Sequence, residues 1–202
     1  MKQPINVILA SQSENRRQLL SSLGIAFSAV PSHIDEEAID HHDLGKKVQA
    51  IAQAKARQVV AEHRGLIIAA DTFSVYNGKQ YHKPKDLGEA KEMLREISGH
   101  IGHVLSGVCV INTQEPREVL ALSTLDIQCR KLSEPEIEDY VTRCPVTEWA
   151  AAYNPLDPIS LTIFKVLGHH PYRIEYYGIG IETVVAELRR AGVAVDLSQA
   201  RA

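Results

Sequence analysis

The chain has 202 residues, 45% of them hydrophobic, and a formal net charge of −3. This composition fits an ordinary packed core. The slight net negative charge excludes the strongly basic surface of proteins that bind the phosphates of nucleic acid, so we expect no nucleic-acid partner. The three cysteines are far apart in sequence, which predicts neither a disulfide framework nor a zinc ribbon and favours a reducing cytoplasm. The apolar run 7–10 is too short for a signal peptide or a membrane span, so we also expect no membrane partner.

A strand expected over 5–10 leads directly into a serine-rich turn and a helix. Ser13 is the expected N-cap of this helix, and Arg16 lies in its first turn. Unpaired N–H groups at such a helix start attract anions, whereas a cation there is unfavourable unless an anion offsets it. The turn therefore predicts a phosphate site that includes Arg16. The alternative is an exposed arginine on an ordinary capped helix.

Three successive carboxylates, at 35–37, follow a second short strand expected over 27–30. Such a run is usually a solvated loop, and a functional interpretation needs one member, for which we select Glu36, to join another carboxylate as a metal ligand. The helix expected over 44–63 carries Lys55 on its apolar stripe, four residues after Ile51. This lysine either extends out of the core along its aliphatic stem or lies beside a phosphate pocket.

The segment 66–84 is the centre of the prediction. Its apolar run 66–70 indicates a buried strand that ends on Asp71 at the edge of a sheet. The Asn-Gly pair at 77–78 suits a type I′ hairpin turn, which would return the chain to Lys83 near Asp71. A carboxylate that holds a hard cation beside an ammonium that neutralises phosphate suits a polyphosphate-metal site. A surface ion pair beside a hairpin is the simpler alternative.

The rest of the chain alternates between helices and strands. Ser106 and Gly107 interrupt one of these strands, which indicates a bulge or a close approach of another backbone. The segment 147–158 is expected to be irregular because it contains two closely spaced prolines. The remaining elements are a helix capped by Asp86 and Glu89, strands over 101–112 and 120–130, a helix capped by Ser133 and Glu136, a strand over 159–167 and a helix over 181–190.

Taken together, these motifs resemble the Maf family, which was first associated with septum formation. Each motif is weak alone, but their order and spacing over roughly the first 145 residues are specific. Ser11, Ser13 and Arg16 are similar to the family's S-x-S-x-x-R, Glu36 to its D-E pair, Lys55 to its A-x-x-K-A helix, Asp71 to its A-D-T, Lys83 to its K-P, and Ser106 stands in place of the threonine of T-G-V.

The resemblance implies a single Maf-like domain over 1–202. Its fold would be α/β, with an elongated twisted mixed sheet flanked by helices and two lobes around a central cleft, as in Maf-like and ITPase-like proteins. It also implies hydrolysis of a nucleoside triphosphate between the α and β phosphates, with Mg²⁺ or Mn²⁺ as cofactor, and often a homodimer. Glu36 and Asp71 would hold the metal, and Asp71, Lys83 and Lys55 would be catalytic. The implied substrate-binding residues are Ser11, Ser13, Arg16, Lys55, Lys83, Ser106, Glu148 and Trp149.

The last quarter departs from the family pattern. Glu148 and Trp149 stand where the family usually has Asp-Lys, and the segment 154–158 replaces its G-I-Q-G. A tryptophan in place of a lysine offers a stacking surface for a base, although packing in the core is the alternative. The rival function is therefore a nucleotide-binding or regulatory protein, related to cell division, that has weak turnover or none.

Overall fold

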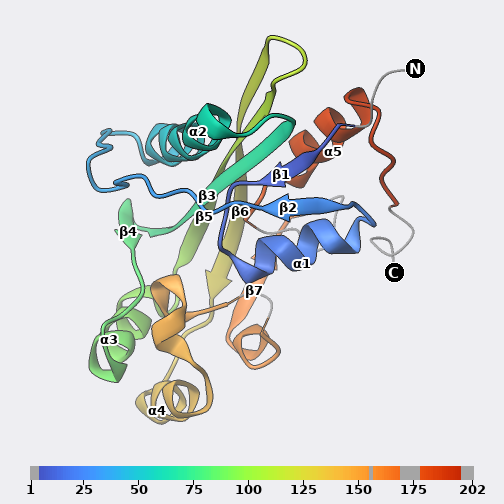
Figure 1. Cartoon of the computed structure of the whole chain (residues 1–202). Helices are drawn as coiled ribbons and strands as arrows, with labels where there is room; N and C mark the ends of the chain where they lie inside the picture. Colours follow the sequence, from blue (N-terminus) through green and yellow to red (C-terminus); the bar gives the residue numbers. More distant parts are fainter. Residues whose placement is uncertain (1–4, 155–156, 169–177, 197–202) are drawn as a thin grey trace. The chain divides into compact units, whose positions relative to one another are not determined.

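The computed structural model describes residues 5–154, 157–168 and 178–196 and contains a mixed β-sheet (Figure 1). Its strand order is β2-β1-β3-β5-β6-β7, with β4 paired to β3, and β1 runs parallel to both β2 and β3. A twisted mixed sheet flanked by helices confirms the predicted α/β class. The strands are β1 (Val7–Leu9), β2 (Phe27–Ala29), β3 (Leu66–Tyr76), β4 (Lys79–Tyr81), β5 (Ile101–Asn112), β6 (Arg117–Cys129) and β7 (Phe164–Leu167). The helices are α1 (Glu14–Ser22), α2 (Leu44–Glu62), α3 (Leu87–Ile97), α4 (Glu134–Arg143) and α5 (Ile181–Arg190).

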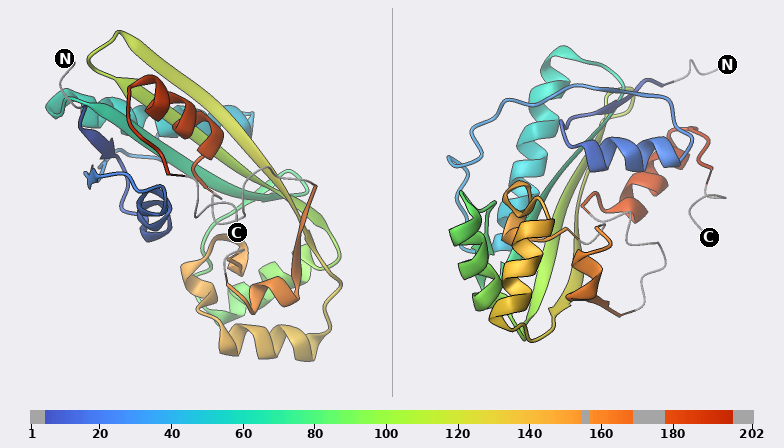
Figure 2. Two further views of the ribbon diagram at one scale, coloured as in Figure 1. Left: turned by 90° about the vertical axis from the view of Figure 1, so that its right-hand side faces the viewer. Right: turned by 90° about the horizontal axis from the view of Figure 1, so that it is seen from below.

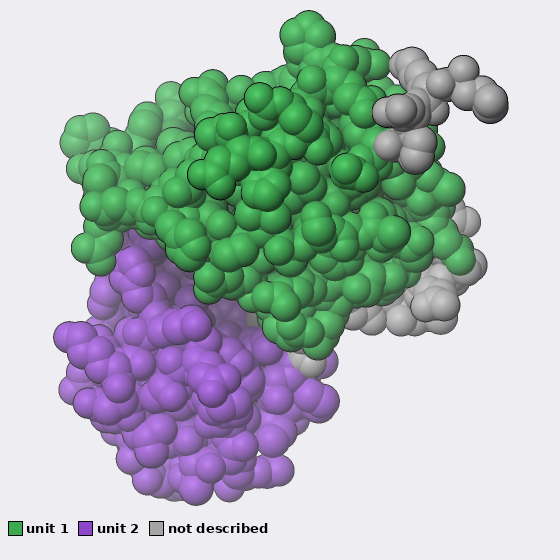
Figure 3. Space-filling view, in the orientation of Figure 1, with its two compact units in different colours: residues 1–72, 106–123, 171–202 green, residues 73–105, 124–170 purple. Residues whose placement is uncertain are grey.

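The chain divides into two compact units, which are coloured separately in Figure 3. Unit 1 comprises residues 1–72, 106–123 and 171–202, and unit 2 comprises residues 73–105 and 124–170. The described helices α1, α2 and α5 belong to unit 1, and α3 and α4 belong to unit 2. Strands β3, β5 and β6 contribute residues to both units, so the chain passes repeatedly from one to the other.

Unit 1 has helices on both faces of its part of the sheet, which can be followed in Figure 2. Successive side chains of β3 point to opposite faces. Ile68 and Ala70 pack with residues of α1 and α5, whereas Ile67 and Ala69 pack with residues of α2. This explains why the run 66–70 is apolar without interruption, since both of its faces are covered.

Gly107 of β5 lies directly beneath the backbone of α2. A Cβ atom at this position would lie 2.4 Å from the carbonyl oxygen of Val48 and 2.7 Å from the backbone nitrogen of Gln49. Real Cβ atoms do not approach backbone atoms so closely, and only glycine permits this contact. The predicted close backbone approach is thus confirmed, and it sets the distance of α2 from the sheet.

Unit 2 contains the predicted hairpin and two capped helices. Asn77 and Gly78 have φ angles of 50° and 74°, as a type I′ turn requires, and they join β3 to β4. Asp86 caps α3 by accepting from the N–H of Glu89, and Ser133 forms the predicted capping box at the start of α4. These features confirm expectations that rest on local side-chain chemistry.

Two predicted strands have different bounds. β3 does not end at Asp71 but continues to Tyr76, because β4 pairs with its second half. The strand expected over 159–167 begins only at Phe164, after a 3₁₀ turn at Ser160–Thr162. Asp157 causes this turn, since its Oδ1 accepts the N–H groups of Ile159 and Ser160 at 2.9 Å each.

Candidate active site

The candidate site lies in unit 1, where β1 ends beside β3. β1 pairs with β3 from Val7 opposite Leu66 to Leu9 opposite Ile68, and the chain then turns away toward α1. Asp71 therefore lies three residues after Ile68, the last residue of β3 that pairs with β1, beyond the carboxyl end of the parallel part of the sheet. Ligands of α/β sheets commonly bind at this edge. The sequence correctly predicted that Asp71 lies at a sheet edge. The edge is formed because β1 ends before it reaches Asp71, whereas β3 itself continues to Tyr76.

Lys55 joins two carboxylates on the α2 side of β3. Its Nζ donates to Asp71 Oδ1 at 2.7 Å and lies 2.8 Å from Glu36 Oε1. Lys55 and Asp71 are only 8% exposed, which rules out the alternative of a solvated surface pair for Asp71. The predicted metal ligands Glu36 and Asp71 are thus brought together. Lys55 contacts both of these carboxylates, which the sequence did not predict, and its expected contact with phosphate stays a prediction.

Local structure explains how each member of this cluster is held. Lys55 lies on the buried stripe of α2 together with Ile51 and Val59, so its stem is fixed and its ammonium emerges above β3. The turn that carries Glu36 is closed by Asp35, whose Oδ1 accepts the N–H groups of Glu37 and Ala38 at 3.1 and 3.3 Å. The cluster therefore combines a rigid helix and strand with a more exposed loop.

The electrostatic environment of Asp71 is mixed. Burial raises the pKa of Asp71 above its ordinary value, because desolvation disfavours the charged carboxylate. The positive charges of Lys55 and Arg16 oppose this increase, and the negative charge of Glu36 adds to it. The carboxylate is consequently a better proton acceptor than a solvated aspartate at the same pH.

Arg16 is the centre of a second polar cluster, on the α1 side of the strand. Its Nη1 donates to Ser11 Oγ at 3.2 Å, its Nη2 donates to Thr72 Oγ1 at 3.0 Å, and its Nε donates to the carbonyl of Gly178 at 2.9 Å. Ser106 Oγ lies 3.3 Å from Thr72 Oγ1. Ser11 and Ser106 are both buried. Three of the predicted phosphate residues thus form one cluster, in which Arg16 contacts Ser11 directly and is linked to Ser106 through Thr72.

Ser13 has the predicted capping role. Its Oγ accepts the backbone N–H of Arg16 at 3.5 Å, and its own N–H donates to Ser11 Oγ at 3.1 Å. The serine-rich turn therefore fixes the start of α1 and the base of the Arg16 side chain together. Leu19 and Leu20 are buried as expected, which anchors the helix against the sheet.

The remaining predicted site residues belong to unit 2. Lys83 and Glu148 are exposed, and Trp149 is half-buried. Trp149 therefore retains exposed surface, in contrast to a tryptophan enclosed in the core. The expected approach of Lys83 to Asp71 stays a prediction, as do the roles of Glu148 and Trp149. Within the replaced segment 154–158, Pro155 and Leu156 lie outside the described residues.

The sequence reasoning missed two members of the Arg16 cluster. Thr72 received no role, although it follows Asp71 directly and must point to the other side of the strand. Its Oγ1 accepts from Arg16 and donates to the Gly178 carbonyl at 3.3 Å. The period of two along β3 is the signal that could have found Thr72. The Gly178 carbonyl is 162 positions from Arg16 and has no local signal.

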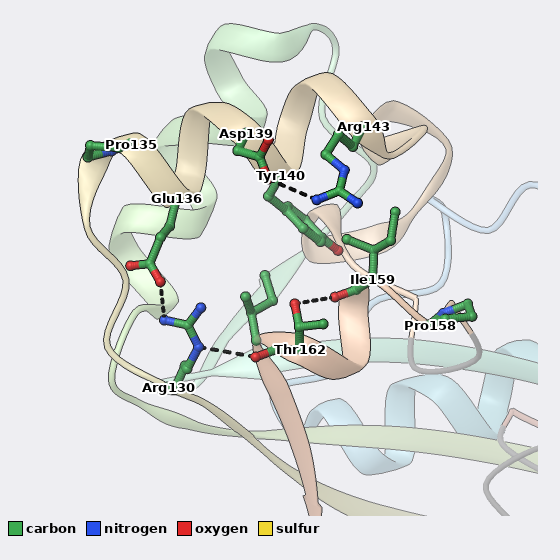
Figure 4. A pocket seen from close by; sticks show the side chains of 10 residues that line it. Arg130, Pro135, Glu136, Asp139, Tyr140, Arg143, Pro158, Ile159 and Thr162 are labelled. Carbon is green, nitrogen blue, oxygen red and sulfur yellow. Dashed lines mark hydrogen bonds and ion pairs between the residues drawn. The ribbon is translucent and has the colours of Figure 1, made fainter.

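Unit 2 also contains a hollow of about 440 Å³ beside α4 (Figure 4). Its two arginines already have carboxylate partners, since Arg130 lies 2.7 Å from Glu136 and Arg143 lies 3.2 Å from Asp139. The hollow therefore offers little net charge to a polyphosphate.

Among residues 5–154, 157–168 and 178–196, no group of three or more His, Cys, Asp or Glu side chains is arranged to hold a metal ion. No helix in these ranges has the length and apolarity needed to cross a membrane.

The chain is thus an α/β protein whose sheet brings carboxylates and cations to the carboxyl end of parallel strands, where ligands of such sheets commonly bind. The sequence comparison identifies it further. The family model described as Maf-like protein matches residues 6–191, and the chain therefore belongs to the Maf family.

Curated relatives agree with this assignment. A dTTP/UTP pyrophosphatase from Geobacillus sp. (strain WCH70) is 33% identical over 188 residues, which cover 92% of this chain and 98% of the relative. A dTTP/UTP pyrophosphatase from Clostridioides difficile (strain 630) is 32% identical over 167 residues, covering 82% of this chain and 86% of the relative. A nucleoside triphosphate pyrophosphatase from Synechococcus sp. (strain JA-2-3B'a(2-13)) is 36% identical over 137 residues, covering 67% and 70%.

Proposed function

We propose that this protein is a metal-dependent nucleoside triphosphate pyrophosphatase that hydrolyses its substrate between the α and β phosphates. The observation that carries the proposal is that two polar clusters lie on opposite sides of β3, one at Asp71 and the other at Thr72. One contains the carboxylates Glu36 and Asp71, and the other contains the guanidinium of Arg16. The names of the similar proteins support a nucleoside triphosphate as substrate. Carboxylates and cations together suit the charges of a triphosphate and its metal.

The donor set fits a hard divalent cation. Mg²⁺ in nucleotide sites takes one or two carboxylates, and phosphate oxygens and water complete its shell. Glu36 and Asp71 supply two carboxylates, and the Lys55 ammonium between them shows that this position already stabilises positive charge. When bound, the metal would supply charge neutralisation for the phosphates and activation of water.

The protein's own residues have distinct roles in this proposal. Asp71 accepts a proton from the attacking water, a role that suits a carboxylate whose pKa burial has raised. Arg16, held by Ser11, Thr72 and Gly178, donates to phosphate oxygens and stabilises the charge that develops during hydrolysis. Lys55 and Lys83 add positive charge, and Ser11, Ser13 and Ser106 contribute polar contacts.

A product assay tests the proposal directly. The purified protein is incubated with ordinary and modified nucleoside triphosphates, with Mg²⁺, with Mn²⁺ or with a chelator. We expect pyrophosphate and the monophosphate in the presence of metal only. Diphosphate and inorganic phosphate would contradict the cleavage position. Ligand-dependent melting without any product would favour the rival function, a nucleotide-binding protein without turnover.

Thr72 is expected to position Arg16 rather than to touch the reacting atoms. In Thr72→Val the side chain keeps its shape but loses the hydroxyl that Arg16 Nη2 contacts. We expect a rise in KM of about ten- to a hundredfold, since hydrogen bonds to charged groups contribute about 1.5–3 kcal/mol, with a smaller change in kcat. Steady-state kinetics measure this, and Thr72→Ser should restore KM. A fall in melting temperature with an unchanged KM would show that the hydroxyl serves only the fold.

Trp149 is expected to alter the preference for the base. A lysine can select a carbonyl by hydrogen bonding, whereas an aromatic surface stacks on different bases for about 1–3 kcal/mol each. We therefore expect this protein to differ from pyrimidine-selective family members in its substrate preference. It should accept a broader range of bases, or prefer a large or modified base. Trp149→Ala and Trp149→Lys should both change the ranking of kcat/KM among bases at little cost in thermal stability. An unchanged ranking with a large loss of stability would assign Trp149 to packing.

A further inference from the structure

The geometry points to Lys55 as a resident cation that occupies the metal position until a metal-nucleotide complex arrives. This inference rests on the proposed function for the identity of the site and adds an order of binding to it. In the absence of nucleotide, the Lys55 ammonium pairs with both Glu36 and Asp71, and a divalent cation alone binds weakly. With nucleotide bound, a phosphate oxygen becomes the partner of Lys55, and the two carboxylates become available to the metal.

The first support is the position of the ammonium itself. Nζ lies 2.7 Å from Asp71 Oδ1 and 2.8 Å from Glu36 Oε1, so it stands between the two carboxylates that would hold the metal. A divalent cation bound to the same two oxygens would lie within a few ångströms of Nζ. Like charges at this range in a partly buried site repel by several kcal/mol. The metal and the ammonium therefore compete for the same oxygens.

The second support is the difference in exposure between the partners. The Lys55 side chain is 10% exposed and the Asp71 side chain 12%, whereas the Glu36 side chain is 48% exposed and lies on a loop. Asp71 and the backbone of Lys55 are fixed by β3 and α2. A small rotation of the flexible end of the lysine, together with movement of Glu36, is enough to break both contacts. The exchange thus needs no rearrangement of the sheet.

The third support is charge balance. The cluster of two carboxylates and one ammonium carries one net negative charge, which is too little to hold a divalent cation firmly beside a retained ammonium. A nucleoside triphosphate brings several negative charges, which offset the metal and attract Lys55 at the same time. Metal and nucleotide should therefore bind cooperatively, since each removes an obstacle to the other.

Direct binding of Mn²⁺ without nucleotide tests this inference. Isothermal titration calorimetry and melting curves are recorded with MnCl₂ for the wild-type protein, Lys55→Gln and Lys47→Met. Lys47 is the matched control, because it lies on the same helix but pairs with the exposed Asp40 at 3.8 Å. We expect Lys55→Gln to bind Mn²⁺ about tenfold more tightly than the wild-type protein, or better, and Lys47→Met to bind as the wild type does.

Stability gives a second readout that does not require activity. Lys55→Gln leaves two carboxylates facing each other, so its melting temperature should fall and then recover as MnCl₂ is added. The wild-type melting temperature should respond little to MnCl₂ alone. Adding Asp71→Asn to Lys55→Gln should remove the gain in Mn²⁺ affinity, which locates it at this site.

Three results would overturn the inference. Firm binding of Mn²⁺ by the wild-type protein without nucleotide would do so even if Lys55→Gln failed to fold. Equal affinities in the wild-type protein and Lys55→Gln would show that the lysine does not compete. A gain that survives Asp71→Asn would place the metal elsewhere. None of these experiments uses a nucleotide. Their outcome is therefore independent of the product assay, which tests the proposed pyrophosphatase function.

Discussion

Asp71→Asn is expected to abolish pyrophosphate release while the fold is retained. Asparagine has nearly the same shape, but its neutral amide is a poor metal ligand and cannot accept a proton from water. Loss of a general base alone lowers rates by about 10²–10⁴, and loss of a metal ligand adds to this. Initial rates of pyrophosphate release at saturating metal and nucleotide measure the effect.

The fold should tolerate this change. Burial raises the pKa of Asp71, because the buried carboxylate has lost hydrating water. A neutral asparagine at this position does not incur this unfavourable desolvation of a charge. Lys55 keeps Glu36 as a partner at 2.8 Å. Glu118→Gln is a matched control, because Glu118 of β6 also receives a cation from α2, through Arg57 at 3.2 Å. We expect this variant to retain activity. A near-wild-type rate for Asp71→Asn would refute the catalytic role.

Much of the architecture could be predicted because its signals are local. The stripe on α2 includes Lys55, and the structure buries that stripe as expected. Ser13 caps α1, and the Asn77-Gly78 turn joins β3 to β4, since side-chain chemistry within a few residues decides both. Asp71 and Glu36 were selected as a pair from the polar positions that follow predicted strands. The structure places both on one lysine.

The errors arose where distant partners decide the outcome. The end of β3 could not be read at Asp71, because pairing with β4 extends the strand and Lys55 accommodates the buried charge. The contacts of Lys55 with Glu36 and Asp71 were not predicted, because a sequence does not show which charged groups lie nearest in space. The contact of Arg16 with the Gly178 carbonyl joins opposite ends of the chain, and no periodicity encodes it.

Gly107→Ala is expected to destabilise the protein strongly and to inactivate it. The added Cβ would lie 2.4 Å from the Val48 carbonyl oxygen and 2.6 Å from its carbonyl carbon, and backbone atoms of a helix cannot move aside as the end of a side chain can. Overpacking of this kind costs about 1–3 kcal/mol, occasionally more. For a chain of this size, 3 kcal/mol lowers the melting temperature by about 6–12 °C.

Gly107→Ala should also lower activity, because α2 carries Lys55. Lys55 lies two helical turns after Val48, so a displacement of the helix at Val48 also moves the ammonium away from Asp71 and Glu36. Gly45→Ala is the comparison, since its Cβ would meet no backbone atom. It would lie 2.9 Å from the movable end of Leu122 and 3.1 Å from Oδ1 of Asp43, the N-cap of α2, so we expect a smaller cost. Thermal melts and rates of pyrophosphate release should separate the two variants, and a Gly107→Ala protein as stable and active as Gly45→Ala would disprove the close packing of α2 on β5.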